Sequence, residues 1–244
     1  MGTKTGVTER DLNIVYAKKL TKFLQDFGIT VINTRLDTNG LYDEITDDYK
    51  LVDMKKRAEI INKSDAQILI SLHMNKFADS SENGAQVFFE QNNQDSENLA
   101  NSIRDILVAN FDNARKLTLA GDYYILNETE PIGVIVECGF LSNPTEEQLL
   151  QNEEYQNKMC YSIYCGIINF LGIFSKEALS FHSSYGIDLM CGFLTSIRGL
   201  LSARRMPSLT LILPRRSRCS AELLRRTPSL LPPMDTETQF LYQT

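Results

Sequence analysis

Two apolar runs most constrain what this chain of 244 residues can fold into. Residues 68–72 (ILISL) and 133–136 (GVIV) hold aliphatic and β-branched side chains and almost no polar ones. Strands that are apolar on both faces are typical of the interior of a sheet covered by helices on both sides. The first run leads into His73 and the second into Glu137. Because open α/β sheets bind ligands at the carboxyl ends of their strands, both side chains are candidates for a functional site.

Each candidate also has an ordinary structural explanation. His73 could be a hydrogen-bonded core residue. Glu137 could belong to an ion pair, because a carboxylate at the end of a buried strand is costly unless it is paired, protonated or bound to a metal. Glu9 lies at an expected helix start, where the helix dipole favours a carboxylate. The choice depends on whether these side chains converge.

The rest of the pattern predicts alternating helices and strands. Thr8 has the side chain of an N-cap and Gly28 follows the last apolar position, so the first helix is expected between them. This alternation predicts an α/β fold, a mixed sheet with helices on both faces. The other expected helices are 48–63, 96–111 and 144–171, and the other expected strands are 29–35, 84–89 and 123–126.

Composition divides the chain after residue 174. Residues 1–174 carry a net charge of −10 and residues 175–244 carry +4. The second part contains Arg-Arg three times and five of the seven prolines, without a sustained period. Such a stretch is typical of a disordered or added segment, and the change in composition also suggests a shifted reading frame. We expect a folded domain over residues 1–174 and an irregular tail over residues 175–244, to which we assign no function.

Composition also excludes several classes of protein. The acidic part lacks the clustered basic residues that a nucleic-acid surface needs. The five cysteines include no C-x-x-C pair, which argues against a disulfide framework and a cysteine-rich zinc site. No signal peptide follows Met1, and no run reaches the roughly 18 apolar residues that span a bilayer.

Three sequence blocks carry a resemblance to one family. Residues 71–75 (SLHMN) resemble the S-[IL]-H-x-N motif of the zinc-dependent N-acetylmuramoyl-L-alanine amidases of the amidase-3 type. Residues 136–144 (VECGFLSNP) are similar to its E-x-G-F-[LI]-[ST]-N block, and residues 6–13 (GVTERDLN) resemble its G-x-x-E-[KR]-D-x-N block. The order and spacing match over residues 6–172. Residues 41–43 (LYD) and 122–126 (DYYIL) look most like the germination-associated subgroup of spore-forming bacteria.

The resemblance implies a site and a reaction. Glu9 and His73 would be zinc ligands, and Glu137 would be the catalytic general base. The substrate would be peptidoglycan, cut by zinc-activated water at the amide between N-acetylmuramic acid and L-alanine. Arg115 is a weaker candidate for substrate binding, and Asn75 or Asn143 could position neighbouring groups without a catalytic role.

One departure from the family is expected to matter. The family has a third ligand, a histidine in a D-x-G-H-G-G-x-D-x-G block on a first strand upstream of Glu9, and neither strand nor block is present after Met1. His182 does not match that motif. Two ligands would bind zinc more weakly than three, and a lost strand would expose unpaired edges on its neighbours.

The resemblance places the reaction outside the cytoplasm, in the bacterial envelope, and leaves an activating protein partner possible. The leading alternative is an inactive truncated fragment, or a remnant that binds the cell wall or a partner. A second alternative is an α/β hydrolase without metal, which lacks support because the chain contains no G-x-S-x-G elbow.

Overall fold

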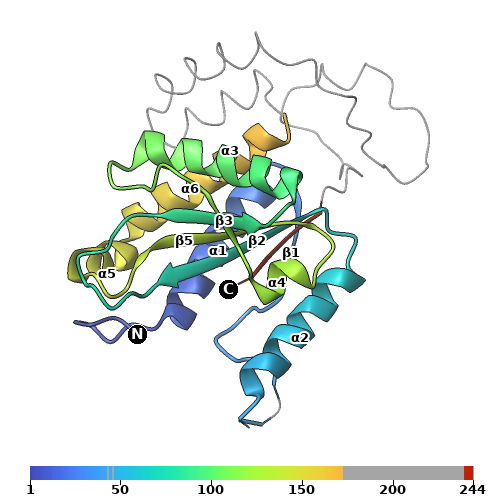
Figure 1. Ribbon diagram of the computed structural model, residues 1–244, viewed down its shortest axis with the longest axis horizontal. Coiled ribbons are helices and arrows are strands. Elements are labelled where there is room, and N and C mark those ends of the chain that lie inside the picture. The colour runs from blue at the N-terminus through green and yellow to red at the C-terminus, as the bar shows by residue number, and fades with distance from the viewer. Residues whose placement is uncertain (43, 46, 173–238, 244) are drawn as a thin grey trace. The chain divides into compact units, whose positions relative to one another are not determined.

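The computed structural model describes residues 1–42, 44–45, 47–172 and 239–243 (Figure 1). The described residues belong to one compact unit of the chain. The expected boundary at residues 174–175 lies outside the described residues. The expected division into a domain and a tail therefore stays a prediction.

The described part of the chain is built on one mixed sheet with the strand order β1-β6-β2-β5-β3-β4. β3 runs antiparallel to β5, and the other paired strands are parallel. The central position of β2 and β5 explains why the two apolar runs carry no solvent-facing side chains. The strands are β1 (Thr30–Asn33), β2 (Ile68–Asn75), β3 (Gln86–Glu90), β4 (Leu119–Gly121), β5 (Ile132–Phe140) and β6 (Gln239–Gln243).

Helices cover both faces of this sheet, which confirms the predicted fold class. Figure 1 shows α3 and α6 along one side and α2 with α4 at the other. α6 packs between α1 and α3. A Cβ on Gly166 of α6 would lie 2.5 Å from the Cα of Ile103 on α3, so α6 and α3 can pack this closely only with glycine at that position. The helices are α1 (Glu9–Asp26), α2 (Tyr49–Lys63), α3 (Gln94–Asn110), α4 (Tyr124–Asn127), α5 (Pro144–Gln151) and α6 (Glu153–Phe170).

The start of α1 follows from its capping residues. The Thr8 side chain accepts a hydrogen bond from the backbone N–H of Asp11 at 3.2 Å, and its hydroxyl donates to the Asp11 carboxylate at 2.6 Å. This arrangement satisfies a backbone donor that the first turn leaves free. It confirms the predicted helix start and places Glu9 as the first helical residue.

Two predicted elements differ from the structure and one was missed. The single helix expected over residues 144–171 is two helices, α5 and α6, which meet at Asn152. Residues 123–126, expected as a strand, instead begin the short helix α4, in which the N–H of Asn127 donates to the carbonyl of Tyr123 at 3.0 Å. A helical turn buries Ile125 and Leu126 together against α2 and the sheet, and an apolar run this short does not distinguish helix from strand. The strand β4 was not predicted.

β6 corrects two expectations about the sheet. It comes from the stretch expected to be irregular, yet its residues pair in parallel with β1 on one side and with β2 on the other. The expectation of an irregular tail is therefore wrong for residues 239–243. The expected unpaired edges are also absent from β1 and β2 where β6 lies, because this strand satisfies their backbone groups. Single-sequence patterns cannot reveal such a pairing, which joins residues about 170 positions or more apart in the chain.

Candidate active site

His73 and Glu137 lie side by side at the carboxyl ends of β2 and β5. The two residues are register partners in this parallel pair. Side chains alternate along a strand, so His73 projects from the same face as Leu69, which packs with Ile135 and Ile61 in the core beneath α2. The convergence expected at this edge of the sheet is thus present in the structure.

Glu9 joins this pair from the first turn of α1. Its Oε1 atom lies 2.8 Å from Nδ1 of His73 and accepts a hydrogen bond from the backbone N–H of Met74 at 3.3 Å. The other ring nitrogen of His73, Nε2, lies 3.0 Å from Oγ of Ser71. The imidazole is therefore contacted at both nitrogens, while the Glu9 side chain keeps 40% and the His73 side chain 32% of its exposure.

The Glu9–His73 contact favours the charged form of both partners. Burial acts to raise the pKa of Glu9, but the hydrogen bond and charge of His73 outweigh it and lower that pKa. Burial acts to lower the pKa of His73, but the hydrogen bond to Glu9 and the Glu137 charge outweigh it and raise that pKa. Both shifts favour the charged Glu9–His73 pair over its neutral form when no metal ion separates the two groups.

Glu137 has the opposite electrostatic character. Burial raises its pKa to about 7, although the charge of His73 acts against this shift. Its Oε2 atom is buried and has no hydrogen-bond partner among the described residues. A buried carboxylate oxygen without a donor is unusual in a stable fold, which makes Glu137 a candidate for a functional role. The Glu137 charge also raises the pKa of Tyr123, after the effect of burial.

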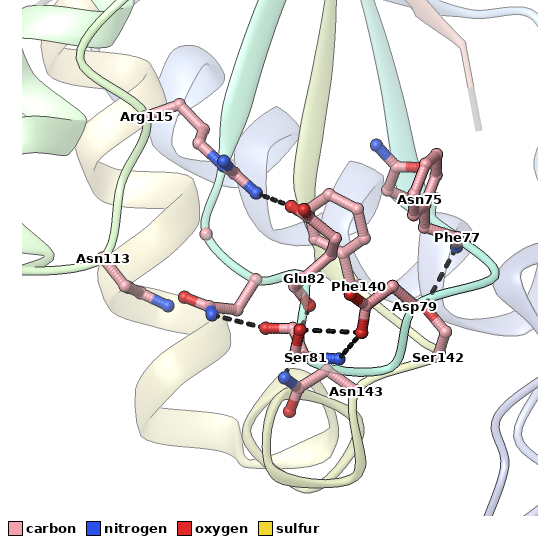
Figure 2. Close-up of polar contacts among 12 residues, drawn as sticks. Asn75, Phe77, Asp79, Ser81, Glu82, Asn113, Arg115, Phe140, Ser142 and Asn143 are labelled. Atoms are coloured by element: carbon pink, nitrogen blue, oxygen red, sulfur yellow. Dashed lines mark hydrogen bonds and ion pairs between the residues drawn. The ribbon is translucent and has the colours of Figure 1, made fainter.

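The loops that follow β2 and β5 are joined by polar contacts, which Figure 2 shows. Arg115 forms an ion pair with Glu82, and its guanidinium carbon lies 5.7 Å from the centre of the Phe140 ring. The Arg115 side chain keeps 38% of its exposure, so it can be reached from solvent. Arg115 thus contacts Phe140, the last residue of the strand that carries Glu137, and its role in substrate binding stays a prediction.

The two asparagines hold these loops. The Asn143 side chain caps α5 by accepting hydrogen bonds from Thr145 and Glu146 N–H groups at 2.9 and 3.1 Å, and it donates to the carbonyl of Glu82 at 3.3 Å. The Asn75 side chain accepts from the N–H of Lys76 at 2.8 Å. These contacts give both asparagines a structural role in the loops.

Sequence reasoning gave no role to Ser71, Tyr123, Glu146 or Glu147. A signal existed for Ser71, since residues two apart on a strand share a face. The others lacked one, because most of their partners are distant in the sequence. Glu146, for example, accepts hydrogen bonds from Gly84, Asn113 and Phe140.

The donor atoms at this site can be compared with what a zinc ion needs. Zinc binds imidazole nitrogen and carboxylate oxygen, and Nδ1 of His73 and Oε1 of Glu9 supply one of each within a single contact. The partnerless Oε2 of Glu137 is next to them in the register. No group of three or more histidine, cysteine, aspartate or glutamate side chains within the described ranges is arranged to hold a metal. Glu9 and His73 thus have the donor atoms and the proximity required of two zinc ligands.

An imidazole and two carboxylates of contrasting pKa, gathered at the carboxyl edge of a mixed α/β sheet, are the groups that metal-dependent hydrolases use. The family model of N-acetylmuramoyl-L-alanine amidases (Amidase_3) matches residues 1–169, and the chain belongs to this family. Members of the family are generally zinc-dependent. The resemblance carried by the three sequence blocks is confirmed.

Relatives agree with this assignment. The chain is 36% identical over 167 residues to the germination-specific N-acetylmuramoyl-L-alanine amidase of Bacillus subtilis, an alignment that covers 66% of this chain and 70% of that protein. It is 28% identical over 169 residues to the probable cell wall amidase LytH of Staphylococcus aureus, covering 68% and 50%.

Solved structures confirm the fold. The CwlD amidase from Clostridioides difficile, solved in complex with the GerS lipoprotein, is 33% identical with a TM-score of 0.67, covering 71% of this chain and 91% of that one. An N-acetylmuramoyl-L-alanine amidase from Clostridium difficile 630 is 28% identical with a TM-score of 0.62, covering 72% and 90%. By family and fold the chain is a peptidoglycan amidase, which excludes the metal-free α/β hydrolase of another class.

None of the described helices is long and apolar enough to cross a membrane.

Proposed function

We propose that this chain hydrolyses the amide between N-acetylmuramic acid and L-alanine with Glu137 as the general base and with Glu9 and His73 as metal ligands. The observation that carries the proposal is the Glu137 carboxyl group, which has a pKa of about 7 and a buried oxygen without a partner, next to the Glu9–His73 pair. A bound zinc ion would supply Lewis acidity toward the amide carbonyl and toward water.

The environment of Glu137 suits proton transfer. A general base works best when its pKa lies near the working pH, because a substantial fraction is then deprotonated and is still basic enough to accept a proton. Oε2 has no donor to compete with an incoming water molecule. The proton taken from water would be returned by the same carboxyl group to the departing amine of L-alanine. The products are a free muramoyl carboxylate and a new amino terminus.

Family relatives also suggest a setting for the reaction. The CwlD amidase was solved bound to a lipoprotein, so we propose that this chain also acts outside the cytoplasm and binds a protein partner. Co-purification with a lipoprotein of this kind, measured by size-exclusion chromatography, tests the second statement. Elution of the two proteins in separate peaks at micromolar concentration would contradict it.

The central test combines metal content with product release. The purified chain should hold about one zinc ion and release L-alanine-terminated peptides from peptidoglycan. Glu137→Gln should abolish release and leave the zinc content unchanged, whereas His73→Ala should lose the metal. Glu154→Gln, an exposed glutamate on α6, is the matched control and should behave like the parent.

The alternative is a chain without activity that binds the cell wall or a partner. It is favoured by one observation, the presence of two ligand side chains rather than three in the described site. Absence of zinc together with absence of new amino termini would establish this alternative. Loss of zinc in Glu137→Gln would instead make Glu137 a ligand and overturn its role as the base.

A further inference from the structure

We infer that Ser71 is a positioning residue that holds the imidazole of His73 through Nε2, so that Nδ1 is the atom presented to Glu9 and to a metal ion. The inference rests on the proposed role of Glu9 and His73 as metal ligands. The proposed function assigns no role to Ser71, and this inference supplies one.

The geometry holds the ring from both ends. Ser71 and His73 lie two residues apart on β2, so their side chains share one face of the strand. Oγ of Ser71 is 3.0 Å from Nε2, and Oε1 of Glu9 is 2.8 Å from Nδ1. A flip of the ring would exchange each nitrogen with a carbon and break both contacts. One ring orientation is therefore favoured.

The chemistry of the two partners is different. A carboxylate can only accept a hydrogen bond, whereas a serine hydroxyl can either donate or accept. When Nδ1 uses its lone pair for a metal ion, the proton of a neutral ring must reside on Nε2. The Ser71 hydroxyl oxygen can then accept a hydrogen bond from Nε2–H. When no metal is bound, Nδ1 donates to Glu9. Ser71 thus satisfies Nε2 in either state.

The position of Ser71 in the fold makes this contact durable. Ser71 is completely buried in the most central part of the sheet, between the backbones of β5 and β6. Its Oγ is therefore held by the rigid strand rather than by a loop. Metal-bound histidines commonly donate their second N–H to such a partner, and loss of the partner typically weakens metal binding by about 10- to 100-fold.

The test compares zinc affinity in three variants, by competition with a chromophoric chelator. Ser71→Ala should bind zinc about 10- to 100-fold more weakly than the parent, and Ser71→Thr, which keeps a hydroxyl, should recover most of the affinity. Ser102→Ala is the matched control. Its hydroxyl is also buried but donates to the Gly166 carbonyl on α6, so its loss should leave zinc affinity unchanged.

A second readout needs no metal. His73 is one of only two histidines in the sequence, so its ring nitrogens can be assigned by NMR against a His182→Ala sample. In the zinc-free protein with a protonated ring, the Nε2–H proton should exchange slowly with water in the parent and at least about 10-fold faster in Ser71→Ala.

The outcomes separate this inference from the proposed function. If the parent binds zinc and Ser71→Ala binds it equally well, Ser71 has no positioning role and the amidase proposal stands. If the parent binds no zinc, the metal role of Glu9 and His73 fails. The proton exchange then decides alone, and equal rates in the parent and in Ser71→Ala overturn the inference.

Discussion

The end of β5 and the first turn of α5 both bury glutamate, with opposite results. Glu146 and Glu147 on α5 are almost completely buried, and each accepts several hydrogen bonds. Glu146 accepts three, and Glu147 accepts four from residues 3–5. Glu137 on β5 has an oxygen that accepts none. The difference separates carboxylates that are fully hydrogen-bonded within the fold from one that keeps an oxygen without a partner.

The pKa values follow this division, but not from hydrogen bonding alone. Four donors hold the pKa of Glu147 at about 2 against the opposing effect of burial. Burial raises the pKa of Glu137 to about 7 without donors to counter it. Burial also raises the pKa of Glu146, despite its three donors and the nearby charge of Arg115. Burial and donors must therefore be weighed together before a carboxylate is assigned a role.

The largest effect should come from Glu137→Gln. Removing the base should lower turnover by about 10²- to 10⁴-fold, because the amide cannot accept the proton of water. The same substitution should increase the stability of the folded protein at neutral pH relative to the parent. A carboxyl group whose pKa is raised stabilises the fold at pH values below its unfolded value and loses that contribution as pH rises toward about 7. The variant should therefore gain stability relative to the parent between pH 5 and pH 8, measured by urea unfolding of the zinc-free proteins.

This result would confirm that Glu137 is held at a cost to stability. A variant that is equally destabilised at both pH values would show instead that Glu137 is a structural carboxylate like its neighbours on α5. Glu154→Gln, which removes an exposed charge, serves as the control in the same measurement.

The second largest effect should be a loss of stability in Glu146→Gln. Oε1 accepts from the Gly84 N–H and the Asn113 amide, while Oε2 accepts from the Phe140 N–H. A glutamine has only one carbonyl oxygen, so one set of donors must face its NH₂ group. A buried donor left without an acceptor costs about 1–3 kcal/mol, which should appear in the free energy of unfolding by urea. A change below about 0.5 kcal/mol would contradict the structural role.

These α5 contacts show where sequence reasoning reaches its limit. Two acidic residues after Asn143-Pro144 look like ordinary first-turn carboxylates favoured by the helix dipole. Their actual partners lie 62 residues away at Gly84 and 144 residues away at Thr3. Nothing local in the sequence marks such contacts. The pairing of β6 with β2 was hidden for the same reason.

The elements that could be predicted have strong local signals. Unbroken apolar runs predict the two buried strands, β2 and β5. The N-cap, the periodic apolar face and the terminal glycine predict α1. The convergence of His73 with Glu137 followed from the general position of sites in α/β sheets. The contact of Glu9 with His73, across 64 residues, was expected only from the family resemblance.

A change in the acid part of the stability curve should follow Glu147→Gln. A carboxylate with a depressed pKa contributes stability that is present above pH 4.5 and is lost as pH falls toward about 2. The variant lacks this contribution at neutral pH, so its stability should fall less than that of the parent between pH 5 and pH 3. Thermal unfolding at the two pH values measures the difference. Parallel curves for the two proteins would mean that residues 3–5 do not hold Glu147 in solution.

The smallest effect on stability should come from Arg115→Gln, which tests the link between the two regions. Its ion pair with Glu82 is partly exposed and is therefore worth at most about 1 kcal/mol. If Arg115 binds the substrate, its loss should raise KM about tenfold or more and leave kcat nearly unchanged. Glu82→Gln breaks the same ion pair but keeps the guanidinium, so its KM should not rise. Equal KM values in the two variants would show that Arg115 only supports the loop, because a substrate contact depends on the arginine and a structural ion pair depends on both partners.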